Sequence, residues 1–129
     1  MIFLKIYTTY FARIRGLPED IEPIAICLKV PDWYVGKSYN QLAPKADFFY
    51  KWKSTQDNDY YVREFNRTVL EQLNIDKVIS DLQALAGDKS IALVCYEAPH
   101  SFCHRHLVAD WLNKNGIECE EYNSALTTS

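Results

Sequence analysis

Residues 91–113 read IALVCYEAPHSFCHRHLVADWLN, and this stretch decides the fold. It opens with six uncharged, mostly apolar residues (91–96), a length and composition typical of a strand buried on both faces. After a short loop, apolar residues recur at helical spacing from Leu107 to Leu112, and Gly116 is a stop signal. A buried strand that leads through a loop into a helix is the repeating unit of a parallel α/β sheet.

The rest of the chain repeats this alternation of strands and helices. Further strands are predicted for residues 2–7, 24–30 and 117–122. Helices are predicted for residues 60–73, 74–86 and 102–115, with a short local helix near 48–53. We therefore predict one three-layer α/β domain over residues 1–124, with a mostly parallel sheet of about four strands, helices on both faces and a frayed tail at 125–129.

Composition agrees with one globular domain and limits the partners. The chain has 129 residues, of which 48% are hydrophobic, and its net charge of −3 argues against general binding to nucleic acid. No apolar run is long enough to cross a membrane, and the first residues do not resemble a signal peptide. Four cysteines without an export signal are expected to stay reduced, so we expect a cytoplasmic protein.

A candidate site follows from the predicted topology, because ligands of parallel sheets bind beyond the carboxyl ends of the strands. The start of the last helix adds backbone N–H groups and a positive dipole end, which favour an anion. Arg105 in this first turn answers either a bound phosphate or a structural carboxylate. The candidate ligand-binding residues at this edge are Tyr7, Thr8, Tyr10, Asp32, Trp33, Tyr34, Cys95, Tyr96, His100 and Arg105.

Helical phase separates the histidines, since His104 shares the sheet-facing side of the helix and His106 is expected in solvent. The candidate catalytic residues are Glu97, Cys103 and His104, with Cys103 as a nucleophile at a helix N-terminus. A zinc site could be assembled from Cys95, His100, Cys103 and His104. Their spacing matches no standard zinc ribbon or finger, so we predict no metal and no cofactor.

The segment also carries a resemblance. Cys95, Glu97, Pro99 and the run Cys103–His104–Arg105 follow the pattern C-x-E-x-P-x-x-x-C-H-R, and the chain resembles the bacterial and phage family called domain of unknown function 488. The resemblance covers nearly the whole chain. It implies a Rossmann-like α/β fold and implies that these residues act as one unit, but it implies no settled activity.

Two functions remain open from the sequence. The first is binding of a small anionic, nucleotide-like ligand at the carboxyl edge of the sheet, which could sequester a nucleotide signal, with aromatic rings stacked beside a phosphate. The alternative is a hydrolase-type enzyme that acts on a nucleotide or nucleic-acid component through Glu97, His104 and Cys103. A homo-oligomer is compatible with either function.

Overall fold

The computed structural model describes residues 5–96 and 102–123. Its strands are β1 (Ile6–Tyr10), β2 (Ile21–Ala25), β3 (Lys37–Ser38), β4 (Ser90–Cys95) and β5 (Cys119–Glu121). Its α-helices are α1 (Ala46–Thr55), α2 (Asn58–Thr68), α3 (Ile75–Ala86) and α4 (His104–Lys114). Three short 3₁₀ helices connect these elements: η1 (Phe11–Gly16), η2 (Asn40–Leu42) and η3 (Leu70–Gln72).

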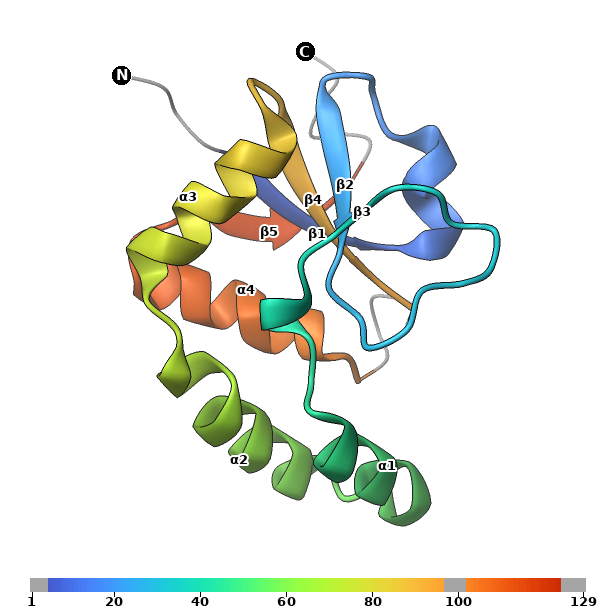
Figure 1. Ribbon diagram of the computed structural model, residues 1–129, viewed down its shortest axis with the longest axis vertical. Helices are drawn as coiled ribbons and strands as arrows, with labels where there is room; N and C mark the ends of the chain where they lie inside the picture. Colours follow the sequence, from blue (N-terminus) through green and yellow to red (C-terminus); the bar gives the residue numbers. More distant parts are fainter. Residues whose placement is uncertain (1–4, 97–101, 124–129) are drawn as a thin grey trace.

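The strands form one parallel sheet in the order β3-β2-β4-β1-β5, so β4 lies in the centre (Figure 1). The sheet has five strands rather than about four, because the two-residue β3 pairs with β2 at its edge. A strand of two exposed residues has no hydrophobic pattern, and this explains why the sequence did not predict it. The central position of β4 agrees with its continuous apolar sequence.

Helices cover both faces of the sheet and make it the middle of three layers. On one face, α2, α3 and α4 bury the side chains of Ile6, Ile24, Ile91 and Leu93. On the other face, η1 and the loop after β2 cover a smaller core that contains Phe11. The chain is therefore a Rossmann-like α/β domain, in which the helix on the second face is a 3₁₀ helix.

The predicted helices are present, and local signals fix their ends. Asp57 caps α2 by accepting a hydrogen bond from the backbone N–H of Tyr60, and Asn74 caps α3 through that of Lys77. Gly87 ends α3 with a φ of 68°, a conformation that glycine adopts at little cost. The region near residues 48–53 lies in the ten-residue helix α1.

The first two strands end at other residues than predicted. β1 ends at Tyr10 rather than residue 7, and β2 ends at Ala25 rather than residue 30. After β2, the N–H of Ile26 still binds the carbonyl oxygen of Val94, and the chain then turns away from the sheet. The apolar run continues because Cys27 and Val30 pack in the second-face core, where they contribute packing and no strand pairing.

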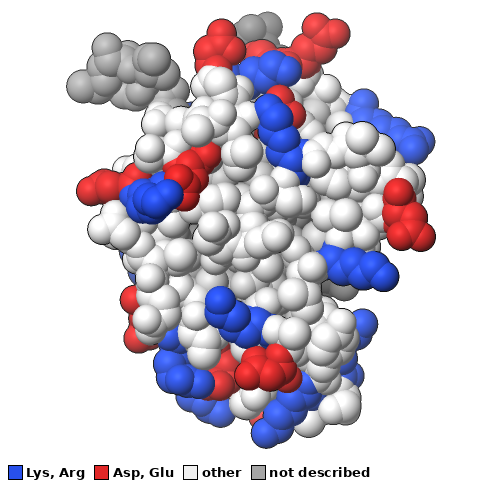
Figure 2. All heavy atoms as spheres, in the orientation of Figure 1, with Lys and Arg blue, Asp and Glu red and all other residues white. Residues whose placement is uncertain are grey.

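Charge is mixed over the face shown in Figure 2, where acidic and basic side chains surround a largely uncharged middle. Basic side chains gather at the lower end, over the region of α1 and α2 in Figure 1. None of the helices within the described residues is both long and apolar enough to cross a membrane.

Candidate functional site

A pocket of about 400 Å³ opens at the carboxyl edge of the sheet, beyond the ends of β2 and β4. Its other walls come from α1, α2 and the start of α4, so residues distant in sequence meet there. The side chains around it are mostly aromatic or sulfur-containing, with two lysines. The lining residues are Cys27, Leu28, Lys29, Pro44, Phe49, Tyr50, Trp52, Lys53, Tyr61, Cys95, Tyr96, Phe102, Cys103 and His104.

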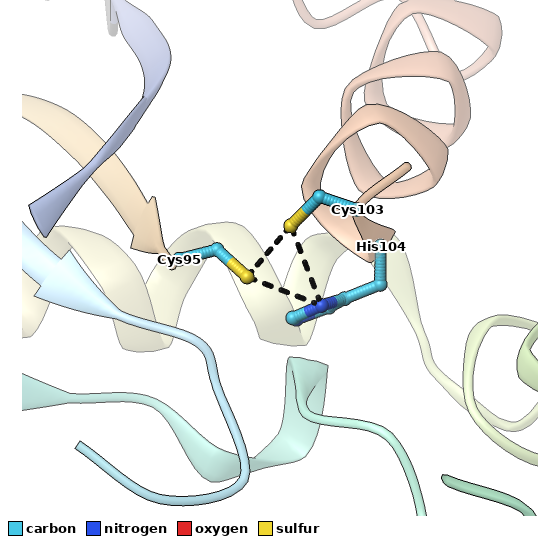
Figure 3. A group of neighbouring side chains, drawn as sticks. All are labelled: Cys95, Cys103 and His104. Carbon is cyan, nitrogen blue, oxygen red and sulfur yellow. Dashed lines mark hydrogen bonds between the residues drawn. The ribbon is translucent and has the colours of Figure 1, made fainter. Parts of the chain in front are cut away.

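Three of the predicted site residues form a buried cluster on one wall of this pocket (Figure 3). Cys95 ends β4, Cys103 is the N-cap residue of α4, and His104 is the first residue of that helix. The two sulfur atoms lie 2.7 Å apart. The His104 Nδ1 atom lies 3.5 Å from the sulfur of Cys95 and 4.0 Å from that of Cys103. The strand end and the helix start therefore deliver their polar groups to one point.

The imidazole of His104 is fixed on two sides. Its Nε2 atom lies 2.6 Å from the carbonyl oxygen of Ile26, a contact that requires Nε2 to carry the proton. The ring of Phe65 packs against the imidazole in an edge-on arrangement, with 5.4 Å between centroids. Since Nε2 donates to the backbone, the Nδ1 atom presents a lone pair to the two sulfurs when the ring is neutral.

The pKa values of the two cysteines are shifted in opposite directions. The hydrogen bond with Cys95 lowers the pKa of Cys103, with a smaller contribution from His104, and these effects outweigh burial. The same contact with Cys103, together with burial, raises the pKa of Cys95. The two shifts have opposite directions because each thiol titrates in contact with the other.

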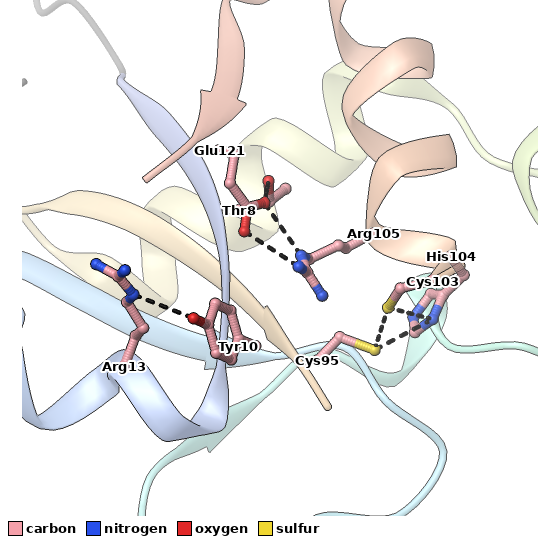
Figure 4. Close-up of polar contacts among 8 residues, drawn as sticks. All are labelled: Thr8, Tyr10, Arg13, Cys95, Cys103, His104, Arg105 and Glu121. Carbon is pink, nitrogen blue, oxygen red and sulfur yellow. Dashed lines mark hydrogen bonds and ion pairs between the residues drawn. The ribbon is translucent and has the colours of Figure 1, made fainter. Parts of the chain in front are cut away.

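Arg105 belongs to a second polar cluster (Figure 4). Its fully buried side chain donates two hydrogen bonds of 3.1 Å to the carboxylate of Glu121 in β5. Thr8 donates to the same carboxylate at 2.7 Å. Burial lowers the pKa of Arg105, but the bond to Glu121 and the charges nearby outweigh it and raise that pKa. Of the two partners that the sequence left open, a structural carboxylate is therefore present.

The other candidates on β1 also lie away from the pocket lining. Tyr7 faces the opposite side of the sheet, where its ring packs edge-on against Tyr122 at 5.6 Å. The guanidinium of Arg105 lies over the ring of Tyr10, 5.6 Å from the ring centroid. The hydroxyl of Tyr10 accepts a hydrogen bond from Arg13. Tyr10 therefore joins the second cluster, and Tyr7 joins a separate small core with Tyr122.

The loop after β2 forms an aromatic group next to the pocket. Trp33 and Tyr34 pack edge-on against Phe11, as does Tyr96, which also lines the pocket. The hydroxyl of Tyr34 donates to the carbonyl oxygen of Lys37, and burial raises its pKa to about 12. Asp32 is exposed to solvent. Of this loop's candidates, none lines the pocket within the described residues.

Three predictions remain, and they concern Glu97, His100 and His106. Glu97 and His100 lie outside the described residues. The expectation that His106 is solvated is wrong, because its side chain is half-buried and its Nε2 atom is fully buried. The first turn of α4 is covered on more sides than an amphipathic helix pattern suggests.

The sequence missed the wall that α1 and α2 contribute. The lining residues that come from these helices are Phe49, Tyr50, Trp52, Lys53 and Tyr61. Tyr50 and Lys53 lie one helical turn apart, but this spacing alone does not distinguish a pocket wall from a solvent-exposed helix face.

One family model matches most of the chain. The model of the group DUF488-N3a, described as the active DUF488-N3 subclade, matches residues 9–116, well over half of the chain. No curated protein and no solved structure matches the chain significantly. The matched range contains β2 to α4 and all three residues of the buried cluster. The chain belongs to the DUF488 family, within its DUF488-N3 subclade.

Proposed function

We propose that this chain binds a small anionic, nucleotide-like ligand in the pocket at the carboxyl edge of its sheet. One observation carries the proposal: the pocket combines a wall of aromatic rings with two lysines, and no acidic residue occurs among its described lining residues. Aromatic rings suit a planar base, and ammonium groups suit a phosphate. A volume of about 400 Å³ is within the range of small-molecule sites.

The proposal assigns the anion to the two lysines of the pocket. Lys53 lies on α1 with its ammonium over the ring of Phe49, and Lys29 lies on the loop after β2. The start of α4 adds the positive end of a helix at the same pocket. The proposal leaves Arg105 out of these contacts, because both Nε and a terminal nitrogen of its guanidinium bind Glu121.

The rings that stack on a base are assigned to the mouth of the pocket. Tyr50 and Tyr96 both line it, and their side chains are 61% and 47% exposed. Tyr96 is held in place by a hydrogen bond from its hydroxyl to the carbonyl oxygen of Lys29. Trp52 and Phe102 lie deeper, tilted against each other at 5.5 Å. A base that enters between these rings has aromatic surface on more than one side.

Recovery of an unchanged ligand would indicate sequestration of a nucleotide signal. The proposal includes a bacterial or phage source and a cytoplasmic setting, and the four free cysteines agree with the latter.

A capture-and-release experiment tests the proposal. The protein is incubated with a panel of nucleotides and cyclic nucleotides and filtered, and the filtrate is analysed by mass spectrometry. The retained protein is then heated and its released compounds are identified. We expect one class of compound to be depleted and recovered intact, with micromolar or tighter affinity. Depletion of none of the compounds would contradict the proposal.

Matched variants locate the binding. Lys53→Ala and Tyr50→Ala should weaken capture, because both residues line the pocket. Lys51→Ala is the control, since Lys51 lies on the same helix with its ammonium over the ring of Tyr60, outside the lining. Equal loss in Lys51→Ala and Lys53→Ala would indicate a general charge effect and no specific site.

The hydrolase alternative is favoured by a separate observation: Cys103 and His104 line the same pocket at a helix N-terminus, in a subclade described as active. The same experiment separates the two functions, because an enzyme returns a product in the filtrate. Loss of turnover in Cys103→Ser or His104→Gln would then identify the reacting groups.

A further inference from the structure

The buried cluster of Cys95, Cys103 and His104 has a second use. Its three donor atoms, two sulfurs and one imidazole nitrogen, all lie within 4.8 Å of one another (Figure 3). Within residues 5–96 and 102–123 it is the one such group of histidine, cysteine and acidic residues found. We propose that these three residues bind a zinc-like divalent ion, and that the fourth position of the ion faces the pocket.

The orientation of His104 is the first argument. A histidine that binds a metal through one nitrogen donates the other N–H to a carbonyl or carboxylate, and this contact fixes the tautomer and the ring. His104 meets that requirement, since its Nε2 lies 2.6 Å from the carbonyl oxygen of Ile26 and its Nδ1 faces both sulfurs. Phe65 packs on the ring and holds its plane.

The positions of the three donor atoms are the second argument. The two sulfur atoms lie 2.7 Å apart in a thiol hydrogen bond. Around tetrahedral zinc, with Zn–S of about 2.3 Å and Zn–N of about 2.0 Å, sulfurs are about 3.8 Å apart and sulfur–nitrogen pairs about 3.5 Å apart. The sulfur–nitrogen distances of 3.5 and 4.0 Å are already close to this geometry. The sulfurs must separate by about 1 Å on binding.

The third argument is the chemistry of the donors. Two thiolates and one neutral imidazole form a ligand set that binds zinc in preference to magnesium or calcium. Two thiolate charges also neutralise a divalent ion, which suits a cluster whose three side chains are all buried.

The pocket decides the type of site. Zinc sites with four protein ligands are closed and structural, whereas sites with three protein ligands keep one position for water or a ligand. All three residues line the pocket, so the described ligand set leaves a position that opens toward it. A bound ion makes Cys103 a ligand and removes it as a free nucleophile. The metal proposal does not depend on nucleotide binding.

Cobalt substitution of the full-length, reduced protein tests the inference. Co²⁺ is titrated into metal-free protein, and Zn²⁺ is then added. We expect the thiolate-to-cobalt absorption of a tetrahedral site, saturating at a single equivalent per chain and displaced by Zn²⁺. Absence of this absorption in the reduced wild type would overturn the proposal.

The chain provides matched controls for each ligand. Cys95→Ser, Cys103→Ser and His104→Gln should abolish the absorption. Cys27→Ser, Cys119→Ser and His106→Gln should retain it, because these residues lie outside the cluster. A signal that survives both Cys95→Ser and Cys103→Ser would overturn the proposal, as would one that disappears in Cys27→Ser.

A measurement on the wild type keeps the test valid if the variants fail to fold. Thiols are alkylated with and without Zn²⁺, and the modified peptides are identified by mass spectrometry. We expect Zn²⁺ to protect Cys95 and Cys103, with no change in the labelling of Cys27 and Cys119. Equal labelling with and without Zn²⁺, or a covalently linked Cys95–Cys103 peptide in the reduced protein, would overturn the proposal.

Discussion

Two polar clusters lie on either side of the first turn of α4, and they differ in what they face. Arg105 turns toward β1 and β5, where Glu121 and Thr8 complete a closed set of hydrogen bonds (Figure 4). Cys103 and His104 turn toward Cys95 and an open pocket. Three consecutive residues thus divide into a structural cluster and a candidate binding cluster.

This difference shows that consecutive residues of one sequence motif can belong to two separate sites. An arginine against the positive end of a helix needs a negative partner, and here the edge strand provides it. This pairing connects α4 to β5 and fixes the start of the helix. Because the helix start is fixed, Cys103 and His104 are held at the pocket wall. Arg105 therefore influences the pocket indirectly, because it fixes the position of the helix start that carries Cys103 and His104.

Arg105→Met should give the largest effect and would test the structural role directly. Removing one partner of a buried ion pair leaves Glu121 without its cation, so we expect the free energy of unfolding to fall by about 3 kcal/mol. Urea unfolding followed by circular dichroism measures the change. Arg67→Met is the control, because Arg67 forms an exposed pair with Glu64 and should change stability little.

The outcome for ligand binding completes this test. If Arg105→Met keeps the stability of the wild type and loses nucleotide capture, then Arg105 is a ligand contact and the two clusters are one site. Adding Glu121→Gln to Arg105→Met should restore part of the lost stability, because it removes the unpaired carboxylate.

Lys53→Ala tests the pocket cluster with the next largest effect. Loss of one charge-assisted contact to a phosphate should weaken binding about tenfold, which is about 1.4 kcal/mol. Stability should not change because Lys53 is exposed on α1. Calorimetric titration of a captured nucleotide measures the affinity, with Lys51→Ala as control. Unchanged affinity in Lys53→Ala would show that Lys53 does not contact the anion.

Thr8→Val removes one hydrogen bond from the structural cluster while it keeps the shape of the side chain. Glu121 then loses its 2.7 Å contact and retains those from Arg105. We expect unfolding free energy to fall by about 1 kcal/mol, with nucleotide capture unchanged. A loss of capture at constant stability would connect the two clusters.

The smallest effect is expected at Asp81, a half-buried carboxylate on α3. Hydrogen bonds from Lys77 and then from Tyr39 lower the pKa of Asp81 below its usual 3.8. This stabilisation is present above pH 3.8 and is lost as pH falls through the lower folded-state pKa. Tyr39→Phe should reduce the acid dependence of unfolding, measured in urea over a series of acidic pH values. An identical dependence in Tyr39→Phe would contradict the assignment.

Much of this comparison was accessible from the sequence. The apolar run before Cys95 predicted a buried strand, and the helical spacing after Cys103 predicted α4, so the meeting of strand end and helix start followed from topology. The position of His104 on the sheet side of the helix also followed from helical phase. Both inferences depend on local pattern and on the rule that parallel strands share one carboxyl edge.

The rest depends on contacts that no local pattern encodes. The sequence did not predict the pairing of Glu121 with Arg105, because that pairing spans 16 residues and depends on β5 lying beside β1. Lys29 and Lys53 come from a loop and from a helix far apart in the chain, and they meet only in the folded pocket. The expectation of no metal rested on spacing templates, which describe other folds and could not show that β4 and α4 bring Cys95, Cys103 and His104 together.

The indole N–H signals of the three tryptophans give the most direct test of the pocket. Trp52 lines the pocket and donates its N–H to Asn58, whereas Trp33 lies on the loop after β2 and Trp111 packs against the core on α4. A ¹⁵N-labelled sample is titrated with the nucleotide panel, and the three signals are followed by NMR. Binding in the pocket predicts that the Trp52 signal shifts while those of Trp33 and Trp111 stay in place. A shift of Trp33 with an unchanged Trp52 would place the ligand on the loop and contradict the account.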